Sequence, residues 1–413
     1  MDKNQLISMS NDARKAISTL NDDNIKRNAL KIIAENLVSK ADEILLANAL
    51  DISNAEINGV SKTMIDRLLL TKERIENISK SVIDVSKLDS PIKIEEKFVH
   101  QNGMIIEKHR VPMGVIAMIY EARPNVTVDA TCLCLMSGNA VILRGGKEAI
   151  NTNLSIVSII KKAILSVGID ENVVNIISDT SHETAEILMS LKGYIDLLIP
   201  RGSKRLIDKV TSTSKIPVIE TGAGNCHTYV EKSADLNKAV KVIVNAKTSR
   251  PSVCNAMEKL LVDEEIAYKF LPMIKTALDV YNVEIRGCEK TVDILKSATL
   301  ATEEDWATEY NDYILAIKVV KNYQEAIERI NLYGTKHSEC IITENEEIAK
   351  EFTLNVDASA VYVNASTRFT DGGEFGLGAE IGISTQKLHA RGPFALDALT
   401  TTKYLIYGNG QTR

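Results

Sequence analysis

The chain has 413 residues, of which 25% are charged and 45% hydrophobic, and its net charge is −6. This length exceeds one ordinary core, so we expect a soluble globular protein of two or three domains. The acidic balance argues against nucleic acid as a partner, and no segment approaches the roughly 18 consecutive apolar residues of a membrane span.

The cysteines indicate a reducing compartment. Six of them are scattered along the chain, and Cys132 and Cys134 stand only two positions apart inside an apolar segment. That pattern is not a paired disulfide framework. The N-terminus also lacks the apolar stretch of a secretion signal. We therefore expect a cytoplasmic protein.

The first part of the chain is predicted to be helical, and a hairpin follows it. Apolar residues recur at helical spacing from Asn4 to Leu88. Residues 97–112 then form two alternating runs joined by Asn102 and Gly103, a dipeptide that favours tight hairpin turns because both positions need positive φ. A polar hairpin here has little core to cover, so we expect it to reach toward another subunit. The last apolar stretch, TTKYLIYG, is a predicted strand that could join the hairpin of a neighbouring subunit.

After Gly114, short apolar runs alternate with helical patterns. Because such strands are apolar throughout, they indicate a parallel sheet covered on both faces, which is a doubly wound α/β unit. In this architecture ligands bind beyond the carboxyl ends of the strands. The predicted strands are residues 115–120, 140–144, 173–177, 195–199 and 217–220.

The loops after three of these strands carry glycine and basic residues. Glycine lets backbone NH groups approach an anion, and the start of a helix favours phosphate. We therefore predict a nucleotide phosphate site, although the GxGxxG fingerprint of the usual dinucleotide fold is absent. The residues of this predicted site are Arg144, Gly145, Gly146, Lys147, Arg201, Gly202, Ser203, Thr221 and Gly222.

A second α/β pattern begins near Thr228 and contains Cys254. The polar residues 247–252 lead into an apolar stretch that can open a helix, which predicts a thiol at a loop-to-helix junction. Positive charge from the helix start, with Arg250 nearby, would favour a thiolate able to attack a carbonyl carbon. The alternative is a small buried hydrophobe, the usual role of a free cysteine. Cys226 and His227 lack a chelating spacing, so we expect no metal site.

Six motifs follow one another along the chain: PMGVIAMIYEARPN, SGNAVILRGGKEA, ETGAGNCH, RPSVCNAMEKLLV, EYNDYILAI and GLGAEIGISTQKLHARGP. Their order resembles the aldehyde dehydrogenase superfamily, most closely the branch that reduces L-glutamyl 5-phosphate. The resemblance runs from Leu6 to Arg413. It implies two doubly wound α/β domains and a small β oligomerisation flap. The implied parts are an NADPH-binding domain of residues 1–94 and 113–226, a catalytic domain of residues 227–388, and an oligomerisation hairpin and C-terminal strand of residues 95–112 and 389–413.

The same resemblance implies NADPH-dependent reduction of L-glutamyl 5-phosphate to glutamate 5-semialdehyde and phosphate, a step of proline biosynthesis. Cys254 matches the nucleophile, and Asn125 with the backbone NH of Cys254 would stabilise the oxyanion. Glu220 matches the base of hydrolytic relatives. Because phosphate and not water is exchanged here, we expect it only to line the cleft or to contact the nicotinamide or the thiol. Glu309 matches the glutamate that binds the nicotinamide ribose, although Asn311 stands where an aromatic residue is usual.

Arg144 replaces the lysine common in NAD-using relatives, and its guanidinium would suit the 2′-phosphate of NADPH. The substrate also needs partners for an amino-acid head and a phosphate. The basic residues in branch-specific motifs are Arg123, Lys247, Arg250 and Arg391, and each could instead form a surface ion pair.

Two other functions stay open at this point: an aldehyde dehydrogenase that acylates coenzyme A, and a non-catalytic nucleotide-binding homologue. The expected partners are the small-molecule substrate, further copies of the chain in a homo-oligomer, and glutamate 5-kinase in a transient complex. A complex with the kinase would shorten the transit of an unstable acyl phosphate.

Overall fold

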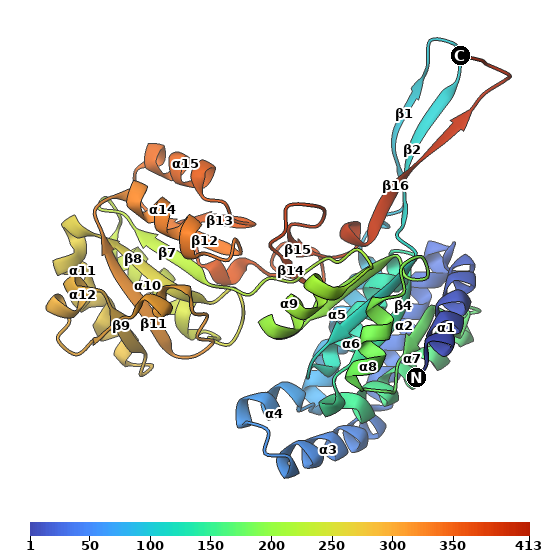
Figure 1. Cartoon of the computed structure of the whole chain (residues 1–413), viewed down its shortest axis with the longest axis horizontal. Coiled ribbons are helices and arrows are strands. Elements are labelled where there is room, and N and C mark those ends of the chain that lie inside the picture. The colour runs from blue at the N-terminus through green and yellow to red at the C-terminus, as the bar shows by residue number, and fades with distance from the viewer. The chain divides into compact units, whose positions relative to one another are not determined.

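The computed structural model describes residues 1–413, apart from the side chains of residues 62 and 63. The chain forms two compact units (Figure 1). Unit 1 comprises residues 1–221, 376–382 and 394–413, and unit 2 comprises residues 222–375 and 383–393. The short strands β14 (Gly382–Ser384) and β15 (Gly392–Phe394) occur where the chain passes between the units.

Unit 1 begins with a layer of helices, as predicted. The layer consists of α1 (Lys3–Ala16), η1 (Ile17–Leu20), α2 (Asp23–Ser39), α3 (Ala41–Ile57), α4 (Lys62–Leu68) and α5 (Lys72–Lys87). Side chains of Asp22 and Thr71 accept backbone NH groups at the starts of α2 and α5, which satisfies donors that a helix start leaves unpaired. Leu30 and Ile33 of α2 are fully buried, so the apolar stripe of the sequence is the packed face.

The predicted parallel sheet of unit 1 is confirmed, with strand order β5-β4-β3-β6. The strands are β3 (Val115–Tyr120), β4 (Ala140–Gly145), β5 (Val174–Ile176) and β6 (Leu197–Arg201), and the helical segments are α6 (Pro124–Met136), η2 (Lys147–Ala149), α7 (Ile150–Ser166), η3 (Glu171–Val173), α8 (His182–Met189) and α9 (Lys204–Thr213). The fifth predicted strand is wrong, because residues 217–220 make only an isolated bridge from Val218 to Leu198. Pro217 has no NH to donate to a ladder.

The hairpin forms an arm of unit 1, which Figure 1 shows standing out from the helices. Its strands are β1 (Ile94–Val99), β2 (Ile105–Pro112) and β16 (Thr400–Tyr407), in the order β1-β2-β16. Gly103 takes a φ of +89° in the turn, as the Asn-Gly signal predicts. The C-terminal strand was predicted to join a neighbouring subunit, whereas here β16 pairs with β2 of its own chain along its whole length.

Unit 2 contains a seven-stranded sheet in the order β10-β9-β11-β8-β7-β12-β13, and every adjacent pair is parallel. The strands are β7 (Cys226–Val230), β8 (Met257–Asp263), β9 (Glu284–Gly287), β10 (Thr299–Leu300), β11 (Ile314–Val320), β12 (Ser338–Ile342) and β13 (Ala360–Val363). The helical segments of unit 2 are α10 (Leu236–Thr248), α11 (Glu264–Asp279), α12 (Glu289–Ile294), α13 (Glu303–Ala307), α14 (Tyr323–Tyr333), α15 (Glu346–Asn355) and η4 (Thr367–Phe369). One further short helix, η5 (Asp397–Leu399), belongs to unit 1.

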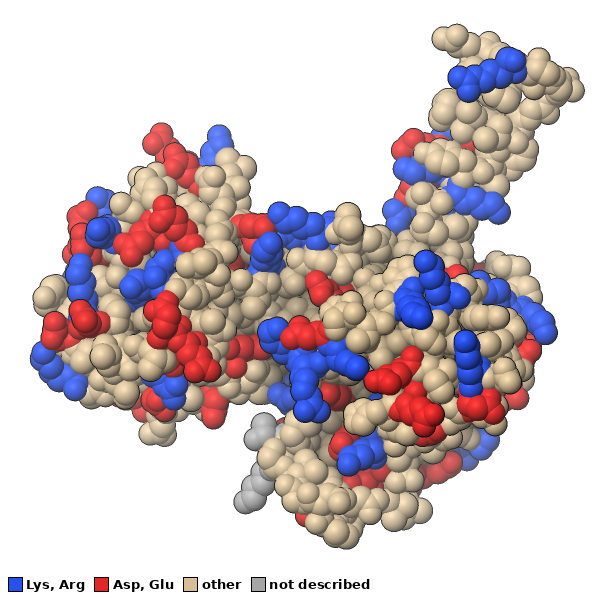
Figure 2. All heavy atoms as spheres, viewed as in Figure 1, with Lys and Arg blue, Asp and Glu red and all other residues tan. Residues whose placement is uncertain are grey.

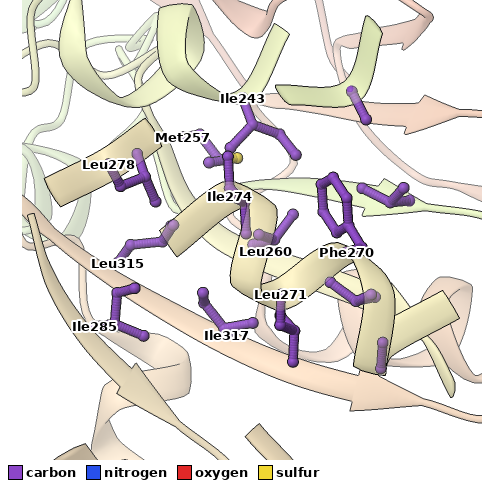
Figure 3. Close-up of a cluster of buried hydrophobic side chains, with 14 of the residues drawn as sticks. Ile243, Met257, Leu260, Phe270, Leu271, Ile274, Leu278, Ile285, Leu315 and Ile317 are labelled. Atoms are coloured by element: carbon purple, nitrogen blue, oxygen red, sulfur yellow. The ribbon is translucent and has the colours of Figure 1, made fainter. Parts of the chain in front are cut away.

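Central strand β8 shows how this sheet is covered. All seven of its residues are buried. Leu260 packs with Phe270 of α11 in the cluster of Figure 3, and Leu261 packs with Phe352 of α15 in a second cluster. Each fully buried leucine side chain contributes roughly 2 kcal/mol to folding. Burial on both faces therefore explains why the run MEKLLVD becomes a strand.

That strand corrects the prediction for Cys254. The residues after Cys254 do not open a helix: residues 251–256 form turns, and β8 begins at Met257. The apolar run that suggested a helix is needed at the centre of the sheet. The segment through Trp306, which the sequence left irregular, contains β9, α12, β10 and α13.

None of the described helices is long and apolar enough to cross a membrane. Charged side chains of both signs are spread over the visible face of each unit (Figure 2). All six cysteines are free thiols.

Candidate active site

The predicted phosphate-binding loops meet at the carboxyl edge of the unit 1 sheet. Tyr120, the last residue of β3, pairs with Gly145 of β4 and with Arg201 of β6. The third loop is tied to β6 because the Thr221 hydroxyl donates to the carbonyl of Pro200 at 3.1 Å. The structure therefore brings together the three loops that the sequence singled out.

Arg144 is half-buried and only partly satisfied. Its Nη2 donates to the carbonyl oxygens of Thr180 at 2.5 Å and Ser181 at 3.1 Å, while its Nε is buried without a hydrogen-bond partner. Burial lowers the pKa of this guanidinium. A buried NH without a partner is unfavourable, so the site fits an anionic ligand such as a phosphate.

The neighbouring residues Gly145, Lys147 and Ser203 differ in whether they could contact a phosphate without rearrangement. A Cβ at Gly145 would lie 2.4 Å from Nδ2 of Asn153, so a glycine is required there. Lys147 is exposed. At the start of α9, Ser203 donates its NH at 2.7 Å and its hydroxyl at 3.1 Å to the carboxylate of Glu121. Glu121 thus stands where the prediction put a phosphate, and a phosphate at Ser203 would have to displace it.

The loop after β3 carries Arg123, the N-cap residue of α6, and Asn125 lies in the first turn of that helix. Nδ2 of Asn125 donates to Asp129 Oδ2 at 3.1 Å, which fixes the amide and leaves its second NH for another acceptor. Burial raises the pKa of Asp129 to about 6, although Asn125 and Arg201 act in the opposite direction. Glu220 is half-buried at the end of unit 1.

Cys254 lies at the amino edge of the unit 2 sheet, between the end of α10 and the start of β8. It is partly exposed. A Cβ at Gly224 would lie 1.4 Å from the carbonyl oxygen of Cys254, so only glycine allows this approach. The thiol of Cys226 donates to the same carbonyl at 3.2 Å. The backbone of Cys254 is therefore held by the turn that precedes β7.

Glu309 joins this group, since its Oε1 accepts the backbone NH of Gly224 at 2.8 Å. The loop of Glu309 is held at both ends. Lys259 donates to the carbonyl of Thr308 at 2.7 Å, and the NH of Asn311 donates to Glu258 at 3.1 Å. Asn311 has a φ of +56°, a conformation that asparagine tolerates better than an aromatic residue does. This explains the departure from the superfamily pattern at that position.

Lys247 takes a different place from the one predicted. Its side chain is 0% exposed, and its ammonium lies 3.0 Å from the carboxylate of the equally buried Glu258. Burial lowers the pKa of Lys247 and raises that of Glu258, and it lowers the pKa of nearby Lys259 to about 7. The ammonium of Lys247 is already paired with Glu258 inside the core, so we do not assign Lys247 to the substrate site.

The other predicted substrate residues of unit 2 lie nearer the surface. Arg250 is exposed, directly after α10. Arg391 lies 2.7 Å from Asp357, which also contacts Lys336 and Lys387. Hydrogen bonds from these cations hold the pKa of Asp357 well below its usual value. Gly222, the last residue of the predicted phosphate loops, donates its NH to Ile383 at 2.8 Å within unit 2.

The sequence gave no indication of Arg368. Its Nε donates to the hydroxyl of Ser249 at 3.0 Å, and its Nη1 donates to the side-chain oxygen of Asn255. Burial lowers the pKa of Arg368, and the charge of Arg250 lowers it further, whereas Asp371 and Cys254 act in the opposite direction. These contacts span more than a hundred residues of chain, so no local pattern could have shown them. In the part of the chain that the structure describes, no three His, Cys, Asp or Glu side chains form a metal-binding group.

Comparisons with known proteins show what the chain is similar to. Residues 2–294 match the model of the aldehyde dehydrogenase family. A gamma-glutamyl phosphate reductase of Clostridium perfringens is 57% identical over 413 residues, which is 99% of this chain and all of that protein. A crystal structure of gamma-glutamyl phosphate reductase from Thermotoga maritima is 49% identical and covers 99% of both chains with a TM-score of 0.95.

A more distant structure, an acetylating aldehyde dehydrogenase from Geobacillus thermoglucosidasius, is 17% identical, covers 100% of this chain and 98% of its own, and has a TM-score of 0.72, which shows a shared fold alone. The near-complete matches go further than the fold. The chain belongs to the aldehyde dehydrogenase family and, within it, to the gamma-glutamyl phosphate reductases.

Proposed function

We propose that this protein catalyses the NADPH-dependent reduction of L-glutamyl 5-phosphate to L-glutamate 5-semialdehyde and phosphate, in proline biosynthesis. The observation that carries the proposal is Cys254, a partly exposed thiol whose backbone is held by Gly224 and Cys226 in a chain whose full-length relatives are gamma-glutamyl phosphate reductases. Its neighbour through Gly224 is Glu309, for which we propose contact with the nicotinamide ribose.

The proposed chemistry divides one difficult reduction into easier steps. The thiolate of Cys254 attacks the carbonyl carbon; a C–S bond forms, the C–O bond to phosphate breaks, and phosphate leaves with the electron pair. When bound, the reduced nicotinamide supplies the hydride that turns the thioester into a thiohemiacetal on Cys254. Collapse of that species releases the aldehyde and restores the thiolate, and the phosphate takes up the one proton that balances the reaction.

The remaining roles are assigned to the residues predicted for them. Asn125 and the backbone NH of Cys254 stabilise the oxyanion, and Glu220 lines the site without activating water. Arg123, Arg250 and Arg391 serve the substrate. The cofactor site consists of Arg144, Gly145, Gly146, Lys147, Arg201, Gly202, Ser203, Thr221 and Gly222. The buried, unpaired Nε of Arg144 supports a phosphate ligand and therefore NADPH.

The experiment that tests this function measures which acyl acceptor the enzyme needs. Purified protein is given glutamate 5-semialdehyde and NADP, and cofactor reduction is followed with inorganic phosphate or with coenzyme A. We expect reduction only with phosphate. A requirement for coenzyme A would instead establish the acylating aldehyde dehydrogenase, and no reduction with either acceptor would favour a non-catalytic homologue.

We further propose that the arm pairs with a second copy of the chain. Its edge strands expose large apolar side chains, with Phe98 49%, Tyr404 56% and Ile406 60% exposed. Unpaired strand edges with apolar side chains favour association. Light scattering should show a smaller assembly for Ile406→Asp, while Tyr268→Asp, at a residue 80% exposed on α11, should leave the mass unchanged. An unchanged mass for Ile406→Asp would show that the arm does not form the contact between copies.

The free thiols are consistent with a cytoplasmic location. A transient complex with glutamate 5-kinase follows from the reactivity of the acyl phosphate, and a pull-down with the purified kinase tests it.

A further inference from the structure

We propose that Arg368, together with Arg250, binds the phosphate group that leaves from the substrate carbonyl at Cys254. This inference rests on the proposed function and names the subsite for the acyl phosphate's phosphate group. Its residues lie within unit 2, at the amino edge of the sheet.

The first support is the position of the guanidinium. Arg368 bonds to Ser249 on one side of Cys254 in the sequence and to Asn255 on the other. Asn255 is itself fixed, because its Nδ2 donates to the carbonyl of Thr370 at 2.8 Å and its carbonyl accepts the hydroxyl of Thr367 at 2.7 Å. The guanidinium is therefore aimed by buried structure along the turn that carries the thiol.

These bonds leave donors for a ligand. A guanidinium has five NH donors in a planar fork, and the contacts to Ser249 and Asn255 use Nε and Nη1. Arg368 is half-buried, which strengthens a charge-assisted bond to an anion. A phosphate dianion accepts two parallel NH bonds from such a fork.

The second support is the pair of like charges. Arg250 is close enough to Arg368 to lower its pKa, and Asp371 and Cys254 are close enough to raise it. Two guanidinium groups that repel each other beside a partly desolvated site are unfavourable unless negative charge lies with them. Asp371 and the thiolate of Cys254 supply part of that negative charge, and the phosphate group of the substrate supplies the rest.

The third support is that no helix start supplies positive charge here. α10 ends at Thr248, so the turn with Cys254 follows the negative end of a helix dipole. No helix begins at Cys254, since β8 follows it. The positive charge that thiolate formation and phosphate departure both need must therefore come from side chains, and Arg368 and Arg250 are placed to supply it.

In the acylation step, the guanidinium groups act on the leaving group. As the C–S bond to Cys254 forms and the C–O bond breaks, the bridging oxygen gains the electron pair and negative charge builds on the phosphate. Hydrogen bonds that strengthen with this charge lower the barrier. In the reverse direction, the same groups hold inorganic phosphate for attack on the thioester.

The test uses the full-length enzyme in the reverse direction, where inorganic phosphate is a substrate. We expect Arg368→Gln to raise the KM for phosphate roughly tenfold to a hundredfold, the loss that follows from a charge-assisted hydrogen bond, with the KM values for NADP and the aldehyde nearly unchanged. Arg250→Gln, at an exposed position, should raise the same KM by a smaller factor. Arg329→Gln on α14, where the guanidinium stacks on Trp306, is the matched control and should have the wild-type KM.

A second measurement detects phosphate binding at this subsite without catalytic turnover. Inorganic phosphate should slow alkylation of Cys254 by iodoacetamide in the wild-type enzyme and should not do so in Arg368→Gln. Arg368→Lys should keep the pH profile of alkylation near that of the wild type, because its charge remains, but should recover little phosphate affinity, because its ammonium lacks the fork.

Three outcomes would overturn the assignment. A KM that rises for the aldehyde alone would mean that Arg368 holds the substrate carboxylate. Equal protection by phosphate in wild type and in folded Arg368→Gln or Arg250→Gln would mean that phosphate binds elsewhere. A lower melting temperature with an unchanged phosphate KM would make Arg368 a structural clamp of the turn. If the wild-type enzyme needs no phosphate at all, the proposed function fails first, and the alkylation assay still reports on the subsite.

Discussion

Units 1 and 2 are both built on parallel sheets, yet their candidate functional groups gather at opposite edges. In unit 1 the glycine loops follow β4 and β6, at the carboxyl edge. In unit 2, Cys254 and Glu309 precede β8 and β11, at the amino edge. Helices begin near a carboxyl edge and end near an amino edge, so only the carboxyl edge offers the free NH groups of a helix start to an anion. The negative charges of a thiolate and a phosphate at Cys254 therefore depend on charged side chains.

The largest expected effect tests whether the amino edge of unit 2 carries the chemistry. Cys254→Ser should lower phosphate-dependent aldehyde oxidation at least about a thousandfold, because a hydroxyl without an activating base is a poor nucleophile. Cys288→Ser is the matched control, since Cys288 is a partly exposed thiol that follows β9 at the opposite edge of the same sheet. Steady-state rates of both variants decide the matter. If Cys254→Ser keeps its rate, the covalent mechanism is excluded.

The next prediction concerns what holds the amino edge together. Lys247→Met leaves Glu258 buried without the ammonium that lies 3.0 Å away, and loss of one partner of a buried ion pair lowers the free energy of unfolding by roughly 3 to 5 kcal/mol. Lys238→Met is a control on the same helix, because Lys238 and Glu344 form an exposed pair that contributes little to stability. Urea denaturation measures both. Equal losses for the two variants would show that the buried pair has no special part in the fold.

Much of the architecture could be predicted from the sequence, and the reason differs between the units. Strands β3, β4 and β6 are apolar runs, and β4 and β6 end in glycine or in a basic residue, so both the sheet and its functional edge could be predicted from local pattern. Gly103 likewise predicted the turn of the hairpin. These features depend on residues that are neighbours in the chain.

The site in unit 2 depended on contacts that local pattern does not contain. The residues after Cys254 have an apolar composition that suits a helix or a strand, and burial on both faces of β8 decided for the strand. Lys247 looked like a surface ligand because its partner, Glu258, stands eleven residues away. The place of Arg368 in the site could not be predicted, because its partners Asn255 and Ser249 are distant in sequence.

The smallest expected effect concerns the buried carboxyl group of Asp129 in unit 1. The buried charges of Lys247 and Glu258 in unit 2 are paired, whereas burial raises the pKa of Asp129 in unit 1 from 3.8 to about 6. Between those two pH values the folded protein keeps a proton that the unfolded chain has released, so the free energy of unfolding falls as pH rises through this window. Above it, the ionised carboxylate opposes folding, by about 1 to 2 kcal/mol once solvent screening of a partly exposed group is allowed for.

Asp129→Asn removes this charge and keeps an acceptor for Asn125. Its melting temperature should therefore exceed that of the wild type at pH 8, and the difference should narrow at pH 5, where the wild-type carboxyl is largely protonated. Asp208→Asn, in the exposed pair with Lys204 on α9, should change stability little at either pH. Thermal melts at the two pH values compare the variants. A loss of stability in Asp129→Asn at pH 8 would mean that the attraction of Asp129 to Arg201 outweighs the unfavourable effect of burial, and that Asp129, like Glu258 of unit 2, is paired with a cation.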